Sequence, residues 1–89
     1  MKPTIGRILH YGLSKDDIAR LPGEKPHRNH HSVGQLVPLI VVCVWKDEFG
    51  PDKPGVNGQA ILDGDHSLWI LSAGEGTEPG TWRWPERAA

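Results

Sequence analysis

The chain has 89 residues, with 10 Lys and Arg, 11 Asp and Glu, and a formal net charge of −1 when histidine is neutral. A chain of this length forms one domain with a thin core, and the lack of a basic excess argues against duplex nucleic acid as a partner. The apolar fraction is only 37%, whereas 11 glycines and 8 prolines are many. We therefore expect short elements joined by many turns, not long helices.

The cellular compartment can be inferred from the cysteine count and from the apolar runs. The single cysteine, Cys43, excludes an internal disulfide and fits a reducing environment. Residues 1–4 lead into a mixed segment and not into the apolar stretch of a secretion signal. The longest apolar run, residues 37–45, is too short to span a bilayer. These features predict a cytoplasmic protein without a membrane partner.

The N-terminal part predicts one strand and one short helix. Residues 5–11 alternate in a way that is typical of a strand. A helix should begin at Ser14, which can serve as N-cap, with Asp17 at the third helical position as in a capping box. Pro22 and Gly23 should end this helix.

A long polar segment, residues 22–36, follows the helix and predicts a mobile loop. Its three histidines, His27, His30 and His31, suggest a metal site at first sight. Zinc needs three or four ligands on a rigid frame, and the chain offers no second ligand cluster with fixed spacing. We therefore interpret the histidines as part of a solvated loop, and we expect neither a metal site nor a cofactor.

The rest of the chain predicts four further strands. Residues 39–45 are apolar on both faces and rich in β-branched side chains, which favours a central strand with Pro38 at its entrance. Residues 56–62 and 67–72 form a hairpin pattern around a turn, and residues 81–84 form a last short strand.

Five short strands, one short helix and glycine-rich connections predict a mainly β fold. We expect residues 1–89 to form one small, partly open β-barrel of the SH3-like or OB-like kind, with the short helix after the first strand.

Two tryptophans near the C-terminus, Trp82 and Trp84, lie two residues apart with Arg83 between them. In an extended segment both indoles would lie on one face. They could form a stacking platform for a nucleobase, with Arg83 or Arg87 at its phosphate. Alternatively, the terminal strand closes the barrel and the indoles fill the core. Because four tryptophans exceed what so small a core needs, we expect at least one to be partly exposed.

The first strand ends at His10 and Tyr11, whose imidazole and phenol can hydrogen-bond a base edge or a phosphate. If this strand end lies near the C-terminal segment, these groups converge on one mouth of the barrel. Alternatively, Tyr11 caps the core and His10 is solvated. The candidate ligand-binding residues are His10, Tyr11, Trp82, Trp84 and Arg87.

No arrangement in the sequence indicates a catalytic centre. The carboxylates fall in cap and turn positions, where they are common for structural reasons. Cys43 lies in an apolar strand and would be a poor nucleophile. Residues 74–80 contain a G-x-G without the helix of a dinucleotide site or the lysine of a P-loop. We predict no catalytic residue, and His10 beside a carboxylate is the one acid–base pair that an enzyme could use.

A resemblance to known proteins is carried by Lys2–Tyr11, Val37–Trp45, Leu62–Gly64 and Gly80–Arg87. These segments resemble a family of very small proteins encoded in bacteriophage and prophage genomes. Arg83 departs from the pattern, which favours histidine or another residue between the two tryptophans. The resemblance implies a phage origin and no particular activity.

A phage origin favours three classes of small protein: virion components, inhibitors of host proteins, and counter-defence proteins. Some of the last class sequester nucleotide signals of bacterial immunity. We therefore expect a non-catalytic protein of the host cytoplasm that binds a nucleotide-like ligand in an aromatic pocket, built as a homo-oligomer. The alternative is a virion component or a host-protein-binding module, which would use the same tryptophans in an interface.

Overall fold

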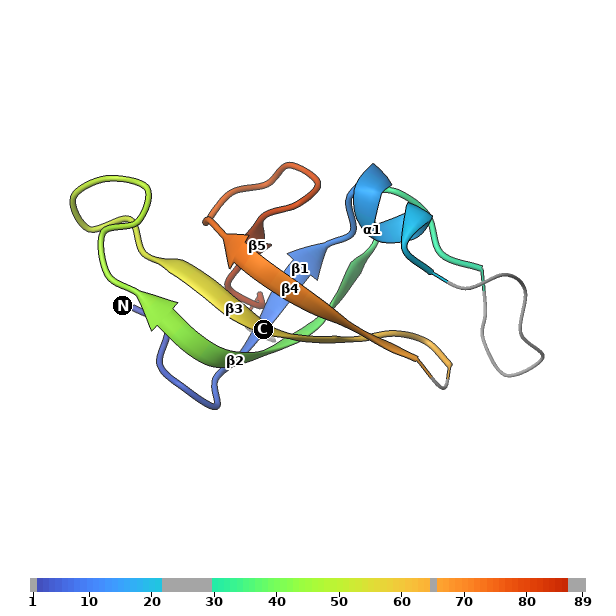
Figure 1. Ribbon diagram of the computed structural model, residues 1–89, viewed down its shortest axis with the longest axis horizontal. Coiled ribbons are helices and arrows are strands. Elements are labelled where there is room, and N and C mark those ends of the chain that lie inside the picture. The colour runs from blue at the N-terminus through green and yellow to red at the C-terminus, as the bar shows by residue number, and fades with distance from the viewer. Residues whose placement is uncertain (1, 22–29, 65, 87–89) are drawn as a thin grey trace.

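A computed structural model of the chain describes residues 2–21, 30–64 and 66–86. It is mainly β, with five antiparallel strands in one sheet of order β4-β3-β2-β1-β5, and one short helix (Figure 1). The elements are β1 (Ile8–Gly12), α1 (Lys15–Ala19), β2 (Leu36–Trp45), β3 (Gly55–Ile61), β4 (Ser67–Ala73) and β5 (Trp82–Arg83). The predicted fold class, a small and partly open β-barrel, is confirmed.

Hydrogen bonds between the two edges of the sheet close the barrel in part. Strands β1 to β4 form a meander, and β5 returns antiparallel beside β1. The Trp82 N–H donates to the Gly74 carbonyl, and the Gly76 N–H donates to the Trp82 carbonyl, both over 2.9 Å. The chain that leaves β4 therefore pairs with β5. The meander favours the SH3-like over the OB-like alternative, since an OB-fold is a Greek key.

Strand β1 begins three residues later than predicted. Residues 5 and 6 form a turn in which Gly6 has a φ of +88°, and the Arg7 N–H donates to the Thr4 carbonyl over 3.0 Å. Ile5 is consequently 74% exposed and does not share the buried face of Leu9. The alternation of residue types continues through this turn, so the sequence pattern does not mark it.

Helix α1 begins as predicted. The Ser14 hydroxyl accepts the Asp17 N–H over 3.0 Å, and the Asp17 carboxylate accepts the Ser14 N–H over 2.9 Å, which completes the capping box. The helix ends at Ala19 with Arg20 as C-cap, and the predicted stop at Pro22 and Gly23 lies outside the described residues. At five residues, α1 is too short to cross a membrane, and it is the one α-helix in the described ranges.

Strand β2 is longer than predicted and is not buried on both faces. Its burial alternates through residues 36–42, with one face in the core and the other exposed. The exposed side chains of this stretch are Leu36, Pro38, Ile40 and Val42. A bulge between Val41 and Cys43 then changes the register, and Val44 packs against the core. The continuous apolar run thus combines a buried face with an apolar outer face.

Pro38 lies inside β2 and not at its entrance. Val41 exchanges hydrogen bonds with the β1 side, because its N–H donates to Arg7 and its carbonyl accepts from Gly6. By alternation, the position of Pro38 points toward β3. Pairing with β3 starts at Leu39, so no ladder donor is required at the proline.

The core fills the interior of the barrel with side chains from every strand. Trp82 is the core residue that β5 contributes, and it is the largest of the fully buried side chains in the described ranges. The buried hydrophobic residues of the described ranges are Leu9, Tyr11, Leu13, Val37, Leu39, Val41, Val56, Ala60, Leu62, Leu68, Ile70, Ala73 and Trp82.

The histidine-rich segment differs from the solvated loop that we predicted. His30 is exposed, but His31 is buried, and its Nε2 accepts the Asp63 N–H over 3.1 Å. His31 thereby ties the segment before β2 to the turn between β3 and β4. His27 and the predicted mobility of residues 22–29 lie outside the described residues.

Candidate functional site

Tyr11, one of the predicted ligand-binding residues, belongs to the core. Its hydroxyl donates to Asp17 Oδ2 over 2.6 Å, and both side chains are buried. Burial and the hydrogen bond to the Asp17 carboxylate raise the pKa of Tyr11 far above its usual value. The phenol therefore fixes the helix to β1 and points away from solvent.

The Asp17 carboxylate is the centre of a small buried network. Besides Tyr11 and the Ser14 N–H, it accepts a hydrogen bond from the Arg20 guanidinium over 2.8 Å. The same guanidinium donates to the Trp69 carbonyl over 3.1 Å, which links α1 to β4. Burial alone would raise the pKa of Asp17, but these hydrogen bonds outweigh it and hold that pKa below its usual value.

This network predicts a specific acid sensitivity. Because the pKa of Asp17 is lower in the folded than in the unfolded protein, its contribution to stability is complete above a pH of about 4 and is lost as the pH falls through the folded-state pKa. We expect Asp17→Asn to lower stability at pH 7 and to flatten the loss of stability between pH 4 and pH 2. Urea unfolding at a series of pH values measures this, and an unchanged acid slope in the variant would contradict it.

Trp82 and Trp84 pack against each other, but of the two only Trp82 is fully buried in the core. Trp82 is 1% exposed, whereas Trp84 is half-buried at the edge of the core. Their ring centroids are 5.7 Å apart at an interplanar angle of 89°, an edge-to-face pair. Trp45 and Trp69 are 49% and 40% exposed, which confirms that at least one tryptophan is partly exposed.

Two predicted site residues remain, His10 and Arg87, and an unpredicted arginine, Arg7, contacts Trp84. The Arg7 guanidinium lies 5.4 Å from the centroid of the Trp84 ring, as a cation–π pair. His10 is half-buried on β1 opposite Arg83, and by strand alternation it faces outward. Arg87 lies outside the described residues. A ligand role for His10, Tyr11, Trp82, Trp84 and Arg87 stays a prediction.

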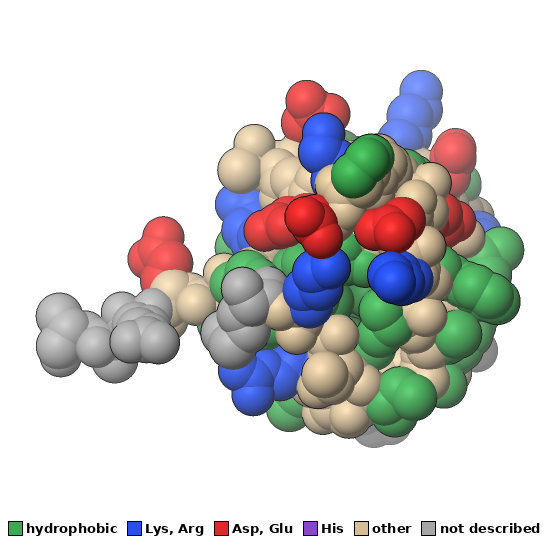
Figure 2. All heavy atoms as spheres, turned by 90° about the vertical axis from the view of Figure 1, so that its left-hand side faces the viewer, with side chains coloured by type: hydrophobic (Ala, Val, Ile, Leu, Met, Phe, Trp, Pro, Cys, Tyr) green, Lys and Arg blue, Asp and Glu red, His purple; other side chains and the backbone are tan. Residues whose placement is uncertain are grey.

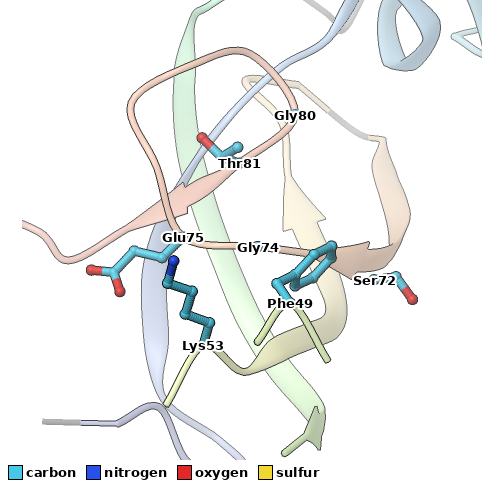
Figure 3. A pocket seen from close by; sticks show the side chains of 7 residues that line it. All are labelled: Phe49, Lys53, Ser72, Gly74, Glu75, Gly80 and Thr81. Carbon is cyan, nitrogen blue, oxygen red and sulfur yellow. The ribbon is translucent and has the colours of Figure 1, made fainter. Parts of the chain in front are cut away.

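A pocket of about 590 Å³ lies between the 46–54 loop and the connection from β4 to β5 (Figure 3). Its lining combines an aromatic ring, an ammonium group, a carboxylate, hydroxyls and glycine backbone. The lining residues are Phe49, Lys53, Ser72, Gly74, Glu75, Gly80 and Thr81.

Glycines let the Phe49 ring lie directly on the backbone. A Cβ at Gly74 would be 3.1 Å from the ring, and one at Gly55 would be 2.9 Å from it. Because both positions lack a side chain, the ring can pack closely there while it stays 49% exposed. One part of the Phe49 ring therefore packs on the backbone, and the rest is accessible to a ligand.

The two charged groups of the pocket come from two segments of the chain, the 46–54 loop and the β4–β5 connection. Figure 3 shows Lys53 rising from the 46–54 loop toward the Gly74–Glu75 segment, with the Glu75 carboxylate directed to the side. The Ser72 side chain lies beyond Phe49 and points away from the Phe49 ring. The Thr81 hydroxyl donates to the Glu78 carbonyl over 2.6 Å and keeps its lone pairs as acceptors.

Strand register places Arg7, just before β1, at the same end of the barrel as the 46–54 loop. There β1 begins, β2 and β4 end, and β3 begins. The Lys2 ammonium reaches Asp52 in the 46–54 loop over 2.8 Å at this end. Figure 2 looks onto this end and shows acidic and basic side chains interleaved, with hydrophobic surface between them.

Sequence reasoning missed the pocket because its parts are distant along the chain. Residues 46–55 contain the Asp, Gly and Pro residues that are typical of a turn, and residues 74–80 contain the glycines of a connection. One signal was present: the single phenylalanine of the chain, Phe49, stands in an otherwise polar turn. The glycines that it covers, Gly55 and Gly74, could not be matched to it without the sheet topology.

Within residues 2–21, 30–64 and 66–86, no three His, Cys, Asp or Glu side chains are grouped to hold a metal ion. Comparison with protein-family models, with curated proteins and with solved structures gave no match to this chain.

Proposed function

We propose that this protein binds a small nucleotide-like ligand, without transforming it, in the pocket between the 46–54 loop and the β4–β5 connection. One observation carries the proposal: the pocket brings the Phe49 ring, the Lys53 ammonium and the Glu75 carboxylate together around about 590 Å³. Sites for small ligands have this size and this mixture of apolar surface and few polar groups.

Each group matches one part of a nucleotide. A base can stack on the exposed Phe49 ring, since every base has a flat π-face. A phosphate can pair with the Lys53 ammonium. The Glu75 carboxylate accepts hydrogen bonds and would take a sugar hydroxyl or an exocyclic amino group. The same carboxylate repels phosphate, so a nucleotide would lie with its phosphate at Lys53 and away from Glu75.

We further propose a counter-defence role in the host cytoplasm, in which the protein sequesters a nucleotide immune signal. The resemblance of both chain ends to small phage proteins supports this role. Sequestration requires tight binding and slow release but no acid–base machinery.

The first experiment measures the thermal midpoint of the purified protein with a panel of cyclic mononucleotides and cyclic dinucleotides. Ligand at 100 times its dissociation constant adds about 2.7 kcal/mol of stability. We expect one class to raise the midpoint and to be recovered intact after heat denaturation. Recovery of an altered molecule would indicate an enzyme, and no shift with any compound would contradict the proposal.

Two variants test the pocket itself. Phe49→Ala removes the stacking surface, and Lys53→Gln removes the charge that pairs with phosphate. We expect each to weaken ligand binding about 10-fold to 100-fold, since stacking on an aromatic ring contributes about 1–3 kcal/mol and a hydrogen bond to a charged group about 1.5–3 kcal/mol. Isothermal titration calorimetry measures this loss.

The control is Lys46→Gln, which removes the same charge from an exposed lysine that does not line the pocket. It should bind as the natural protein does. Equal losses in Lys46→Gln and Lys53→Gln would mean that general electrostatics, and not the pocket, attracts the ligand.

A second candidate function, a protein-binding module, is favoured by a different observation. Each of the strands β1 to β4 has at least one large hydrophobic side chain that is substantially exposed. This apolar outer surface lies apart from the pocket residues, so the two functions are separable by mutation.

A further inference from the structure

Both strands beside β3 carry an extra residue at the level of Asn57. On the β2 side, Val42 is the extra residue between two positions that pair with β3. On the β4 side, Asn57 alone stands opposite Leu71 and Ser72. A β-bulge bends its strand and often re-aims side chains beside a functional site. Asn57 therefore marks a bend of the sheet, at the level where β4 reaches the pocket.

The side chain of Asn57 is buried and supplies a hydrogen-bond acceptor at the β4 bulge. Asn57 is 7% exposed, and its Oδ1 accepts the Ser72 N–H over 2.7 Å. The extra residue of a bulge leaves the regular ladder, so its N–H needs another acceptor. A buried amide is costly unless it makes hydrogen bonds. The contact between Asn57 and Ser72 therefore satisfies one polar group of each residue.

Ser72 has an unusual backbone conformation that this contact supports. Its φ is +55°, in the left-handed region that glycine adopts readily and that other residues adopt at a cost. The conformation turns the chain at the end of β4, where Ala73 lies in the core and Gly74 follows. Because Asn57 belongs to the neighbouring strand β3, its amide holds this turn from outside β4.

The turn at Ser72 leads directly into one wall of the pocket, which is formed by Ser72, Gly74 and Glu75. Figure 3 shows this wall passing beside the Phe49 ring. A Cβ at Gly74 would be 3.1 Å from that ring, so the wall packs closely on it. The Gly74 carbonyl accepts a hydrogen bond from β5. The wall is thus held by β5 on one side and by Asn57 on the other.

We propose that Asn57 is a positioning residue of the pocket. Its amide holds Ser72 in the left-handed conformation and thereby holds the wall against the Phe49 ring. Asn57 does not line the pocket itself, so it acts through Ser72 and not by contact with a ligand. The effect on nucleotide binding rests on the proposed function of the pocket. The effect on the wall needs no ligand, so the two can be tested separately.

NMR of the ligand-free protein tests the position of the wall. In the natural chain we expect three signals: a Ser72 amide protected from exchange, a strong NOE between the Ser72 amide and Hα protons, which a positive φ brings together, and an NOE between the Phe49 ring and the Gly74 Hα. Asn57→Leu removes the amide oxygen at similar volume and should lose all three. Ser72→Gly in that background should restore the Phe49–Gly74 NOE, because glycine adopts a positive φ without support.

Gln59→Leu is the matched control, because it makes the same kind of change on β3 at a position where the register with β4 is regular. It should keep all three signals. If Asn57→Leu does not fold, Asn57→Ala takes its place, and the signals of the natural chain remain a test that needs no variant. The proposal is overturned if the natural chain lacks these signals, if a folded Asn57 variant keeps them, or if Ser72→Gly does not restore the NOE.

Isothermal titration calorimetry connects the wall to binding. The titrant is the cyclic mononucleotide or cyclic dinucleotide that raises the thermal midpoint most. We expect Asn57→Leu to weaken its binding about 10-fold, since a wall that must be ordered on binding lowers the affinity. Ser72→Gly in that background should recover most of the loss. An unchanged affinity with the NMR signals lost would overturn the role of the wall in binding. If no compound binds the natural chain, the proposed function fails, and the NMR signals still decide the role of Asn57.

Discussion

Replacement of Trp82 by alanine is expected to unfold much of the population at 37 °C. The indole is 1% exposed and fills the side of the core between β5 and the other strands. Truncation of a buried tryptophan costs about 3–5 kcal/mol. A domain of this size has a thin core, and its total stability lies near the lower end of the usual range of about 5–15 kcal/mol. The substitution would therefore remove most of the available stability.

Urea unfolding followed by circular dichroism measures this effect. Trp45→Ala is the control, because the Trp45 side chain is 49% exposed and should cost less than about 1 kcal/mol. The β5 backbone also closes the barrel through Gly74 and Gly76, so loss of the Trp82 side chain loosens the connection that lines the pocket. A Trp82→Ala variant as stable as Trp45→Ala would show that β5 does not close the core.

Replacement of Asp17 by alanine is the second large effect that we expect. The variant leaves the buried Tyr11 hydroxyl without its acceptor and frees the Arg20 guanidinium that joins α1 to β4. Hydrogen bonds to a charged group contribute about 1.5–3 kcal/mol, and an orphaned buried hydroxyl adds a cost of its own. We expect a loss of about 3 kcal/mol in the free energy of unfolding.

Asp16→Ala is the matched control for this experiment. Asp16 precedes Asp17 in the same helical turn but is exposed, so its loss should cost about 0.3–1 kcal/mol through the helix dipole. Tyr11→Phe in the Asp17→Ala background should then restore part of the lost stability, because it removes the orphaned hydroxyl. Equal effects of Asp16→Ala and Asp17→Ala would show that the network does not stabilise the fold.

Local patterns in the sequence predicted most of the fold. Ser14 and Asp17 marked the helix start, because a capping box depends only on residues three apart. The hairpin of β3 and β4 followed from a turn between two apolar alternations. The start of β1 was wrong by three residues, since the turn at Gly6 interrupts the strand without interrupting the alternation.

Features that depend on contacts distant along the chain could not be predicted. The buried His31 looked like a loop residue, because its acceptor role requires the Asp63 N–H from another turn. The central run of β2 looked buried on both faces, because periodicity cannot distinguish a covered face from an apolar exposed one. The pocket required the topology that brings Phe49 beside Gly74.

The two surfaces described above separate two kinds of binding. The pocket mixes an aromatic ring with both signs of charge, as a small polar ligand requires. The exposed surface of strands β1 to β4 carries no Lys, Arg, Asp or Glu and is largely apolar, which suits a protein contact. Phe49→Ala should therefore weaken ligand binding, whereas Ile40→Glu, on the exposed surface of β2, should leave ligand binding unchanged.

The most direct test is two-dimensional NMR of the ¹⁵N-labelled protein during titration with the cyclic mononucleotides and cyclic dinucleotides of the panel. Nucleotide binding in the pocket predicts that one compound shifts the amide signals of Phe49, Lys53, Gly74, Glu75 and Thr81, while those of His10 and Ile40 stay in place. Nucleotide binding in this pocket would be contradicted if no compound moved any signal, or if the shifts centred on His10, Trp84 or Ile40.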